Sequence, residues 1–157
     1  MQPTKYGKYF ITDTPPNPNH PENRKKGSSM PWENSLYISE ELNGTAKGAF
    51  YLETNMVVRT GTIELVSKSH SHPFDEYLMF LGTDPEDQSY LGGEVEFWVG
   101  DEKHMITRTC AVFVPGGVAH CPLYFHRVDR PFMFITTGNT LGYRYDGESA
   151  TPAPKAR

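Results

Sequence analysis

The chain has 157 residues, which is enough for one domain with a substantial hydrophobic core. Aromatic residues make up 13% of it, which argues against disorder, and the net charge of −4 with a single short basic run, RKK, argues against nucleic-acid binding. No apolar run approaches the roughly 20 residues of a membrane helix, and the first ten residues lack an apolar signal core. Two cysteines, Cys110 and Cys121, are too few for a disulfide framework. We therefore expect a cytoplasmic protein without nucleic-acid or membrane partners.

The N-terminal part of the chain is rich in proline. Residues 14–31, TPPNPNHPENRKKGSSMP, hold five prolines and almost no apolar side chains. Proline removes a backbone donor and interrupts both helices and central strands, so this segment predicts an extended arm. We expect residues 1–35 to form an extended or partly ordered arm, which is either mobile or lies along the body or a partner subunit.

The pattern changes from about residue 35. Short apolar and aromatic runs alternate with Gly, Pro, Asn and Asp: SLYIS, GAFYLE, NMVVRT, TIELVS, EYLMFL, EVEFWV, HMITRT, AVFVP, CPLYF and PFMFITT. This spacing predicts an antiparallel all-β sandwich or barrel over residues 36–145, with a flexible tail at 146–157. Only residues 38–44 have the character of a helical turn.

The stretch HSHPFDE contains the first candidate metal ligands. On a strand, side chains two apart share a face, with Cα atoms about 6.6 Å apart. The imidazoles of His70 and His72 can therefore converge on one ion, and a turn after Pro73 can bring Glu76 to the same place. An H-x-H pair alone is also common among ordinary surface or core histidines.

A second stretch, PGGVAHC, strengthens the metal interpretation. Its Pro-Gly-Gly turn allows a sharp reversal that places His120 at the head of a new strand. The resulting set has three imidazoles and one carboxylate, all on short strands of one β domain. Such a set can hold a divalent transition metal with one or two open positions.

The first of these stretches resembles the first conserved motif of the cupin superfamily. That motif consists of a glycine, five residues, His-x-His, three or four residues, Glu, and a further glycine. His70, His72 and Glu76 match it, and Gly82 stands near the closing glycine, while the leading glycine is replaced by Glu64.

The second stretch resembles the second cupin motif, which reads glycine, five residues, Pro-x-Gly, two residues, His, three residues, Asn. Pro115, Gly117 and His120 match, whereas Thr109 replaces the leading glycine and Tyr124 the closing asparagine. These departures concern turns and a strand end rather than the ligands. The resemblance covers roughly residues 50–138.

The resemblance implies a double-stranded β-helix, or jelly-roll barrel, with a metal at its centre. The ligands it implies are His70, His72, Glu76 and His120. Metals of the family include iron, manganese, nickel, zinc and copper, and we expect one divalent ion per chain, Fe, Mn, Ni or Zn, with Fe or Mn favoured. Many cupins are dimers, so we also expect a homodimer.

Three further residues are candidates for a catalytic role. Tyr124 shares strand parity with His120, so its phenol is expected at the pocket mouth as a hydrogen-bond donor or general acid, unless it is a packed barrel aromatic. Lys68 and Arg59 are the basic residues closest to the motifs, and either is a partner for an anionic substrate or an ordinary surface charge.

Cys121 directly follows His120, so a regular strand turns it to the opposite face as a small buried filler.

These features favour a metal-dependent enzyme acting on a small, aromatic or enolic molecule, first of all a dioxygenase or oxygenase. A non-redox lyase, isomerase or decarboxylase uses the same ligands, so they do not decide between the two. A small-molecule-binding cupin without catalysis is the second class of function, and a structural or storage protein is the third.

Overall fold

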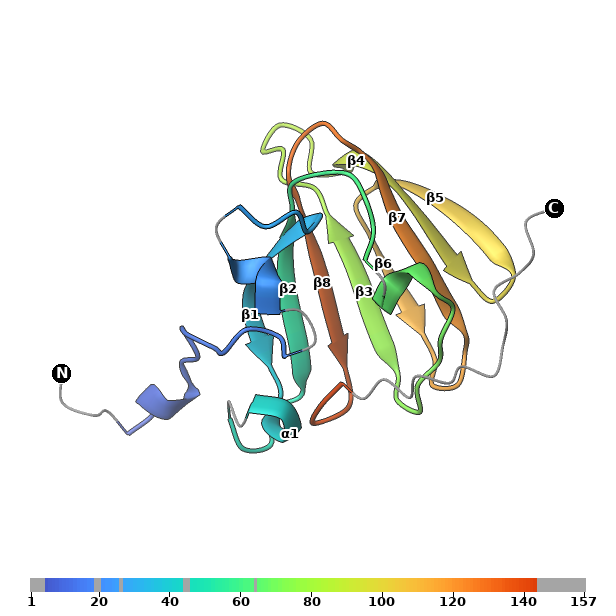
Figure 1. Ribbon diagram of the computed structural model, residues 1–157. Coiled ribbons are helices and arrows are strands. Elements are labelled where there is room, and N and C mark those ends of the chain that lie inside the picture. The colour runs from blue at the N-terminus through green and yellow to red at the C-terminus, as the bar shows by residue number, and fades with distance from the viewer. Residues whose placement is uncertain (1–4, 19–20, 26, 44–45, 64, 144–157) are drawn as a thin grey trace.

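The computed structural model describes residues 5–18, 21–25, 27–43, 46–63 and 65–143, which form an almost entirely β structure in two antiparallel sheets (Figure 1). The larger sheet has the strand order β1-β2-β8-β3-β6, and the smaller has the order β5-β4-β7. The strands are β1 (Trp32–Ile38), β2 (Tyr51–Val57), β3 (Glu76–Leu81), β4 (Tyr90–Val99), β5 (Glu102–Arg108), β6 (Cys110–Val114), β7 (His120–Val128) and β8 (Phe132–Gly138). The short helices are η1 (Gly7–Tyr9), η2 (Pro21–Arg24), α1 (Glu40–Asn43) and η3 (Leu65–Ser67).

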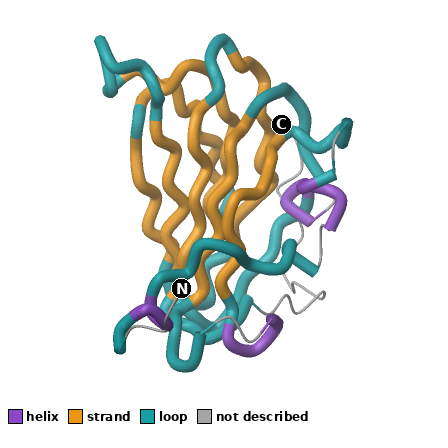
Figure 2. Tube along the Cα trace, turned by 90° about the vertical axis from the view of Figure 1, so that its left-hand side faces the viewer, coloured by secondary structure: helices purple, strands orange, loops and turns teal. Residues whose placement is uncertain are grey.

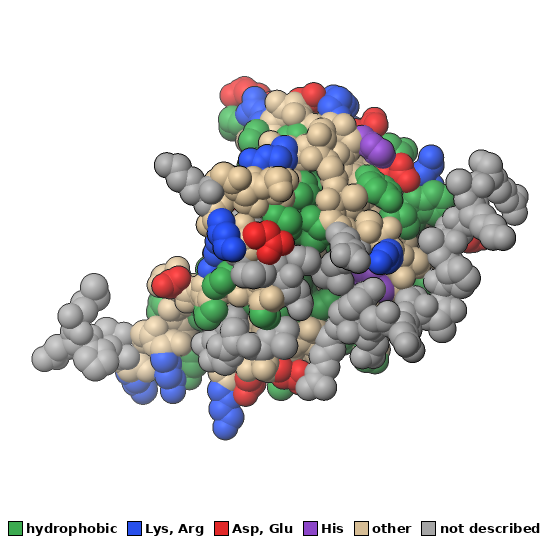
Figure 3. Space-filling view, in the orientation of Figure 1, with side chains coloured by type: hydrophobic (Ala, Val, Ile, Leu, Met, Phe, Trp, Pro, Cys, Tyr) green, Lys and Arg blue, Asp and Glu red, His purple; other side chains and the backbone are tan. Residues whose placement is uncertain are grey.

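The strands run side by side and are joined by loops at both ends (Figure 2). The predicted all-β, jelly-roll class is confirmed. In the described part of the chain, no helix has the length and apolar character needed to cross a bilayer. On the face drawn in Figure 3, basic side chains are interspersed with acidic ones.

Alternation along the strands places the core between the sheets. Every second residue of β2, β3 and β8 is buried, as expected for strands with one covered face. Phe80 stacks on Phe134 with ring centroids 5.1 Å apart, and the edge of Trp32 meets Phe134 and Phe125. Burying each such side chain contributes roughly 1.5–3 kcal/mol to the free energy of unfolding.

A register shift in β7 decides which of its side chains face the core. Val99 pairs with His120 but Phe97 pairs with Leu123, so β7 carries one more residue than β4 over this interval. An extra residue of this kind reverses the alternation beyond it. The expectation that Cys121 and His120 lie on opposite faces is therefore wrong, because both are buried and line the same pocket.

The proline-rich segment lies partly against the larger sheet. Thr14 and Asn17 are buried, and the Arg24 guanidinium donates to the carbonyl and hydroxyl of Thr14 and to Asn34 Oδ1 on β1. Strand β1 begins at Trp32, so the sheet starts inside the range predicted for the arm. The predicted tail at 146–157 lies outside the described residues.

Candidate metal centre

The two histidine motifs meet at a single backbone bridge. His70 N–H donates to the His120 carbonyl at 2.9 Å, and His120 N–H donates to the His70 carbonyl at 2.8 Å. The Pro-Gly-Gly turn is tied to the first motif as well, because Gly117 N–H donates to the His72 carbonyl at 2.8 Å. A Cβ at Gly116 would lie 2.7 Å from the Pro73 carbonyl oxygen, so this close approach requires glycine.

The three imidazoles are oriented by backbone carbonyls. Nδ1 lies 3.2 Å from the Lys68 carbonyl in His70, 2.9 Å from the Phe74 carbonyl in His72 and 3.1 Å from the Val118 carbonyl in His120. These contacts assign the proton to Nδ1 and leave a lone pair on each Nε2. One ligand nitrogen from each ring lies within 4.8 Å of the others, and all three residues are buried. The three histidines could therefore bind a metal ion.

Glu76, the first residue of β3, points into the same cluster. Its Oε2 lies 3.0 Å from His72 Nε2 and 3.3 Å from His120 Nε2, and His120 Nε2 is buried without a hydrogen bond of good geometry. Burial alone would raise the pKa of Glu76, but interactions with His120 and His72 lower it below its ordinary value. Burial, followed by the proximity of His120, lowers the pKa of His70 to about 4. The cluster thus combines a neutral His70 imidazole with an ionised Glu76 carboxylate.

This arrangement needs a cation. With each imidazole proton on Nδ1, lone pairs on the rings and on the carboxylate would face one another in a buried site, where repulsion between them is poorly screened. A proton or a metal ion between these atoms removes that repulsion. Three imidazoles and one carboxylate suit a divalent transition metal, and the carbonyl partners of Nδ1 are the orienting contacts that such sites need.

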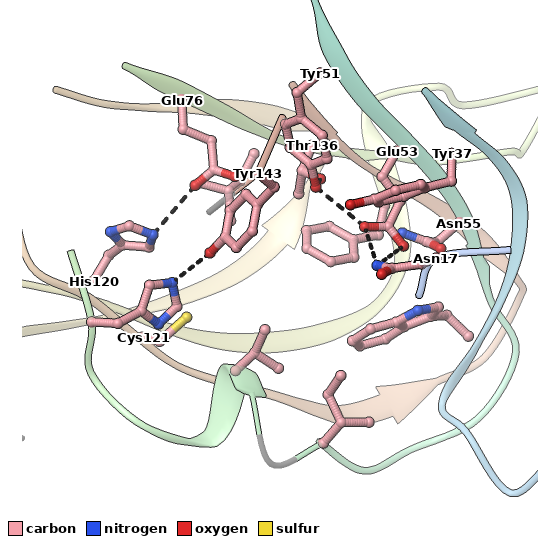
Figure 4. A pocket seen from close by; sticks show the side chains of 16 residues that line it. Asn17, Tyr37, Tyr51, Glu53, Asn55, Glu76, His120, Cys121, Thr136 and Tyr143 are labelled. Atoms are coloured by element: carbon pink, nitrogen blue, oxygen red, sulfur yellow. Dashed lines mark hydrogen bonds and ion pairs between the residues drawn. The ribbon is translucent and has the colours of Figure 1, made fainter. Parts of the chain in front are cut away.

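A small cavity of about 50 Å³ lies beside the cluster. Glu76 lies at one end and Glu53 at the other, with Tyr51 between them (Figure 4). The remaining lining residues are Asn17, Trp32, Tyr37, Asn55, Ile63, Val66, His70, Leu78, His120, Cys121, Phe134, Thr136 and Tyr143. The end away from the histidines is polar, and sequence reasoning did not predict it.

Glu53 is the charged residue of that polar end. It is 7% exposed, and its carboxylate accepts hydrogen bonds from Asn17 Nδ2, Asn34 Nδ2 and the Tyr51 hydroxyl at 3.2–3.3 Å. Burial raises the pKa of Glu53 to about 7, because these neutral donors offset the loss of water only in part. Glu53 is therefore able to gain and lose a proton near neutral pH.

The sequence of β2 contains a pattern that indicates the polar end of the cavity. The run YLETNMV alternates, and its inward positions are Tyr51, Glu53, Asn55 and Val57. Polar side chains at inward positions of a half-buried strand indicate a site rather than a core. Asn17 carried no such signal, since it comes from the proline-rich segment.

The three residues considered for catalysis lie away from the cavity. Tyr124 pairs with Glu96 and stacks on the exposed His126, because the register shift of β7 turns it from the core. Lys68 is exposed, and its backbone carbonyl is what contacts His70. Arg59 is exposed and donates to the carbonyls of Ser28 and Met30.

Tyr143 is a further residue that sequence reasoning missed. Its hydroxyl lies 3.0 Å from His70 Nε2, and its ring packs against Tyr51, His72 and Phe74. The hydroxyl therefore donates to the lone pair that a metal would use. No motif marked this position, which lies beyond the last strand.

No protein-family model matches the sequence, and no curated protein matches it. Among solved structures, oxalate oxidase in complex with the substrate analogue glycolate is 11% identical, with a TM-score of 0.51. A recombinant oxalate oxidase in complex with glycolate is also 11% identical, with a TM-score of 0.50. Each match covers 77% of this chain and 57% of the oxalate oxidase chain, so this chain spans little over half of their length.

These neighbours are cupin-fold proteins. The chain has the cupin fold, and the resemblance inferred from its two histidine motifs is confirmed at the level of the fold.

Proposed function

We propose that this protein is a metal-dependent enzyme that acts on a small organic molecule. The observation that carries the proposal is the convergence of three buried imidazole nitrogens and the Glu76 carboxylate. The ligands are His70, His72, Glu76 and His120, and the ion is one divalent transition metal, with Fe or Mn favoured. Such an ion supplies Lewis acidity, and iron or manganese supplies redox chemistry as well.

The volume and the lining of the cavity restrict the class of substrate that it can hold. Its volume of about 50 Å³ is well below the roughly 150 Å³ of a cavity that holds benzene. Its described lining contains no Lys or Arg, whereas Tyr51, Asn55 and Thr136 offer neutral hydrogen-bonding groups. A compact, uncharged molecule with hydroxyl or enol groups fits this lining better than an aromatic ring or a polyanion.

We propose an oxygenase acting on such an enolic substrate as the first reaction class. A non-redox lyase, isomerase or decarboxylase is the second, and the observation that favours it is Glu53, whose pKa near 7 suits proton transfer. A binding protein without catalysis is the third. The glycolate complexes of oxalate oxidase suggest small α-hydroxy carbonyl compounds as additional compounds to screen.

Metal analysis of protein purified without chelator and without air tests the proposal. About one equivalent of iron or manganese per chain supports it, and oxygen consumption with small enolic compounds then identifies the oxygenase. Zinc, or manganese without oxygen consumption, directs the search to isomerisation and decarboxylation. Failure to bind Fe, Mn, Ni or Zn after each is added back would contradict the enzyme and favour the binding protein.

We also propose a homodimer formed through the outer face of the larger sheet. Tyr77 and Met79 on β3, Phe113 on β6, and Met133 and Ile135 on β8 lie on this face. The rings of Tyr77 and Phe113 are 47% and 50% exposed and lie 5.1 Å apart. Exposed aromatic side chains beside half-buried aliphatic ones on one sheet face are typical of a protein interface.

A further inference from the structure

The cavity contains a second carboxylate, Glu53, which is not one of the proposed metal ligands. Glu53 lies at the opposite end from Glu76, and the negative charge of Glu76 contributes to the raised pKa of Glu53. Asn17, Asn34, Tyr51 and Asn55 surround its oxygens with neutral donors. Among the described residues, no cationic side chain pairs with Glu53. A buried carboxylate of this kind destabilises the fold when taken alone, so its presence indicates a functional role.

The hydrogen bonds of Glu53 hold its carboxylate in one orientation. Asn17 Nδ2 lies 3.2 Å from both carboxylate oxygens, and Tyr51 donates to Oε2 while it contacts Thr136 Oγ1 at 2.7 Å. Asn17 is itself buried, and its segment is held in place by Arg24. The N-terminal segment therefore completes this end of the cavity.

The cavity wall contains a further buried polar group, the indole N–H of Trp32. Trp32 is 3% exposed, and its indole Nε1–H has no hydrogen-bond partner among the described residues. An unsatisfied buried donor costs about 1–3 kcal/mol, so its place in a cavity wall indicates that a bound molecule or water accepts this hydrogen bond. An oxygen-bearing substrate supplies such an acceptor.

We propose that Glu53 is the acid–base residue of the site, exchanging a proton with a neutral hydroxyl- or enol-bearing substrate held between it and the histidine cluster. The substrate O–H bond breaks, the proton passes to the Glu53 carboxylate, and the electron pair stays on the substrate oxygen as an oxyanion. Glu53 becomes a neutral carboxylic acid and returns the proton in the later protonation of the product. This inference rests on the proposed enzyme function.

The groups facing Glu53 are consistent with this role. The Tyr37 phenol from β1, the Tyr51 phenol from β2 and the Glu76 carboxylate from β3 are the titratable groups close to it. Burial raises the pKa of both tyrosines, so they stay neutral at working pH. The Asn17 segment adds only an amide. Glu53 thus has the proton affinity that a base working near pH 7 requires.

The number of protons released when a small hydroxyl-bearing metal ligand binds tests this role of Glu53 without knowledge of the substrate. The probe is acetohydroxamic acid, which binds transition metals through two oxygens and loses its hydroxyl proton when it does so. Calorimetry of metal-loaded protein at pH 8, in buffers of different ionisation enthalpy, gives the number of protons released. In the wild type, Glu53 takes up the proton that the probe loses, so little of it reaches the buffer. Glu53→Gln cannot take it up, and its complex should release about one more proton per site than the wild type. Glu33→Gln, which changes an exposed carboxylate on β1, should match the wild type.

The outcomes separate this inference from the proposed function. Equal proton release by the wild type and Glu53→Gln would overturn the role of Glu53 and leave the metal site intact. No binding of the probe to metal-loaded wild type would overturn both. If Glu53→Gln does not fold, infrared titration of the wild type decides: a buried carboxylic acid that ionises near pH 7 supports the role, and ionisation of all carboxyl groups below pH 5 overturns it.

Discussion

His70 and His120 form a two-hydrogen-bond backbone bridge, and their rings lie 4.5 Å apart. The bridge joins the loop before β3 of the larger sheet to the start of β7 of the smaller sheet. The cluster therefore exists only when both sheets are in place. Neither motif alone has the geometry of a metal site.

Replacement of a ligand should remove the metal. His72→Ala leaves two imidazoles and one carboxylate, so bound metal measured by mass spectrometry should fall from about one equivalent to a small fraction of it. His126→Ala is the matched control, because His126 is exposed on the outer face and pairs with Glu96. Full metal content in His72→Ala would mean that the ion binds elsewhere.

Removal of the Tyr143 hydroxyl should strengthen metal binding. This hydroxyl donates to His70 Nε2, and an ion that binds that nitrogen must displace it. A hydrogen bond of this kind contributes about 0.5–1.5 kcal/mol, so Tyr143→Phe should lower the Kd for the metal by roughly two- to tenfold in competition titrations. Tyr124→Phe should leave the Kd unchanged, since Tyr124 lies away from the cavity. A weaker affinity in Tyr143→Phe would instead identify the phenol as a ligand.

Glu53 should give the protein a distinctive dependence of stability on pH. Its pKa is raised from 4.5 to about 7, so the folded state holds a proton that the unfolded chain releases. The contribution of this bound proton to the free energy of unfolding is fully present below pH 4.5 and is lost as the pH rises through 7. Glutamine cannot ionise, so the free energy of unfolding of Glu53→Gln relative to wild type should rise by on the order of 3 kcal/mol between pH 4.5 and pH 9. Urea denaturation curves measure it, and parallel pH profiles for the two proteins would contradict a raised pKa.

The packing of the N-terminal segment against β1 should depend on Arg24. Arg24 contacts Thr14, Asn34 and the Ser35 carbonyl, so Arg24→Ala leaves partly buried acceptors without their donor. We expect a loss of about 1–3 kcal/mol in the free energy of unfolding and faster proteolytic cleavage before β1. Lys25→Ala, at the exposed neighbouring position, is the control. Unchanged cleavage in Arg24→Ala would show that other contacts hold the segment.

The proposed dimer should be sensitive to charge on the outer sheet face. Phe113→Asp places a carboxylate opposite Tyr77, and burying it unpaired in an interface is unfavourable. Analytical ultracentrifugation should show a dimer for the wild type and a monomer for Phe113→Asp. Met105→Asp, an exposed apolar position on β5 of the other sheet, should stay dimeric. A monomeric wild type at micromolar concentration would contradict the dimer.

Local patterns were sufficient for the all-β class and for the candidate ligands. Strand alternation and turn residues predict an all-β sandwich because both depend on neighbours along the chain. The spacing of His70 and His72 and the turn before His120 are equally local, and the structure brings these residues within 4.8 Å. The all-β class and the candidate ligands could thus be predicted from local patterns, whereas the jelly-roll and the meeting of the two motifs at one metal were implied by the resemblance to cupins.

The rest of the site depends on contacts between distant residues. One extra residue in β7 relative to β4 turns Cys121 toward the cavity and Tyr124 away from it, and strand parity within β7 does not show that shift. Glu53 acquires its raised pKa only where the folded sheets remove it from water, and the hydrogen bond from Asn17 offsets part of that rise. Burial and cross-strand register arise from the packing of whole sheets, so neither can be read from spacing along the chain.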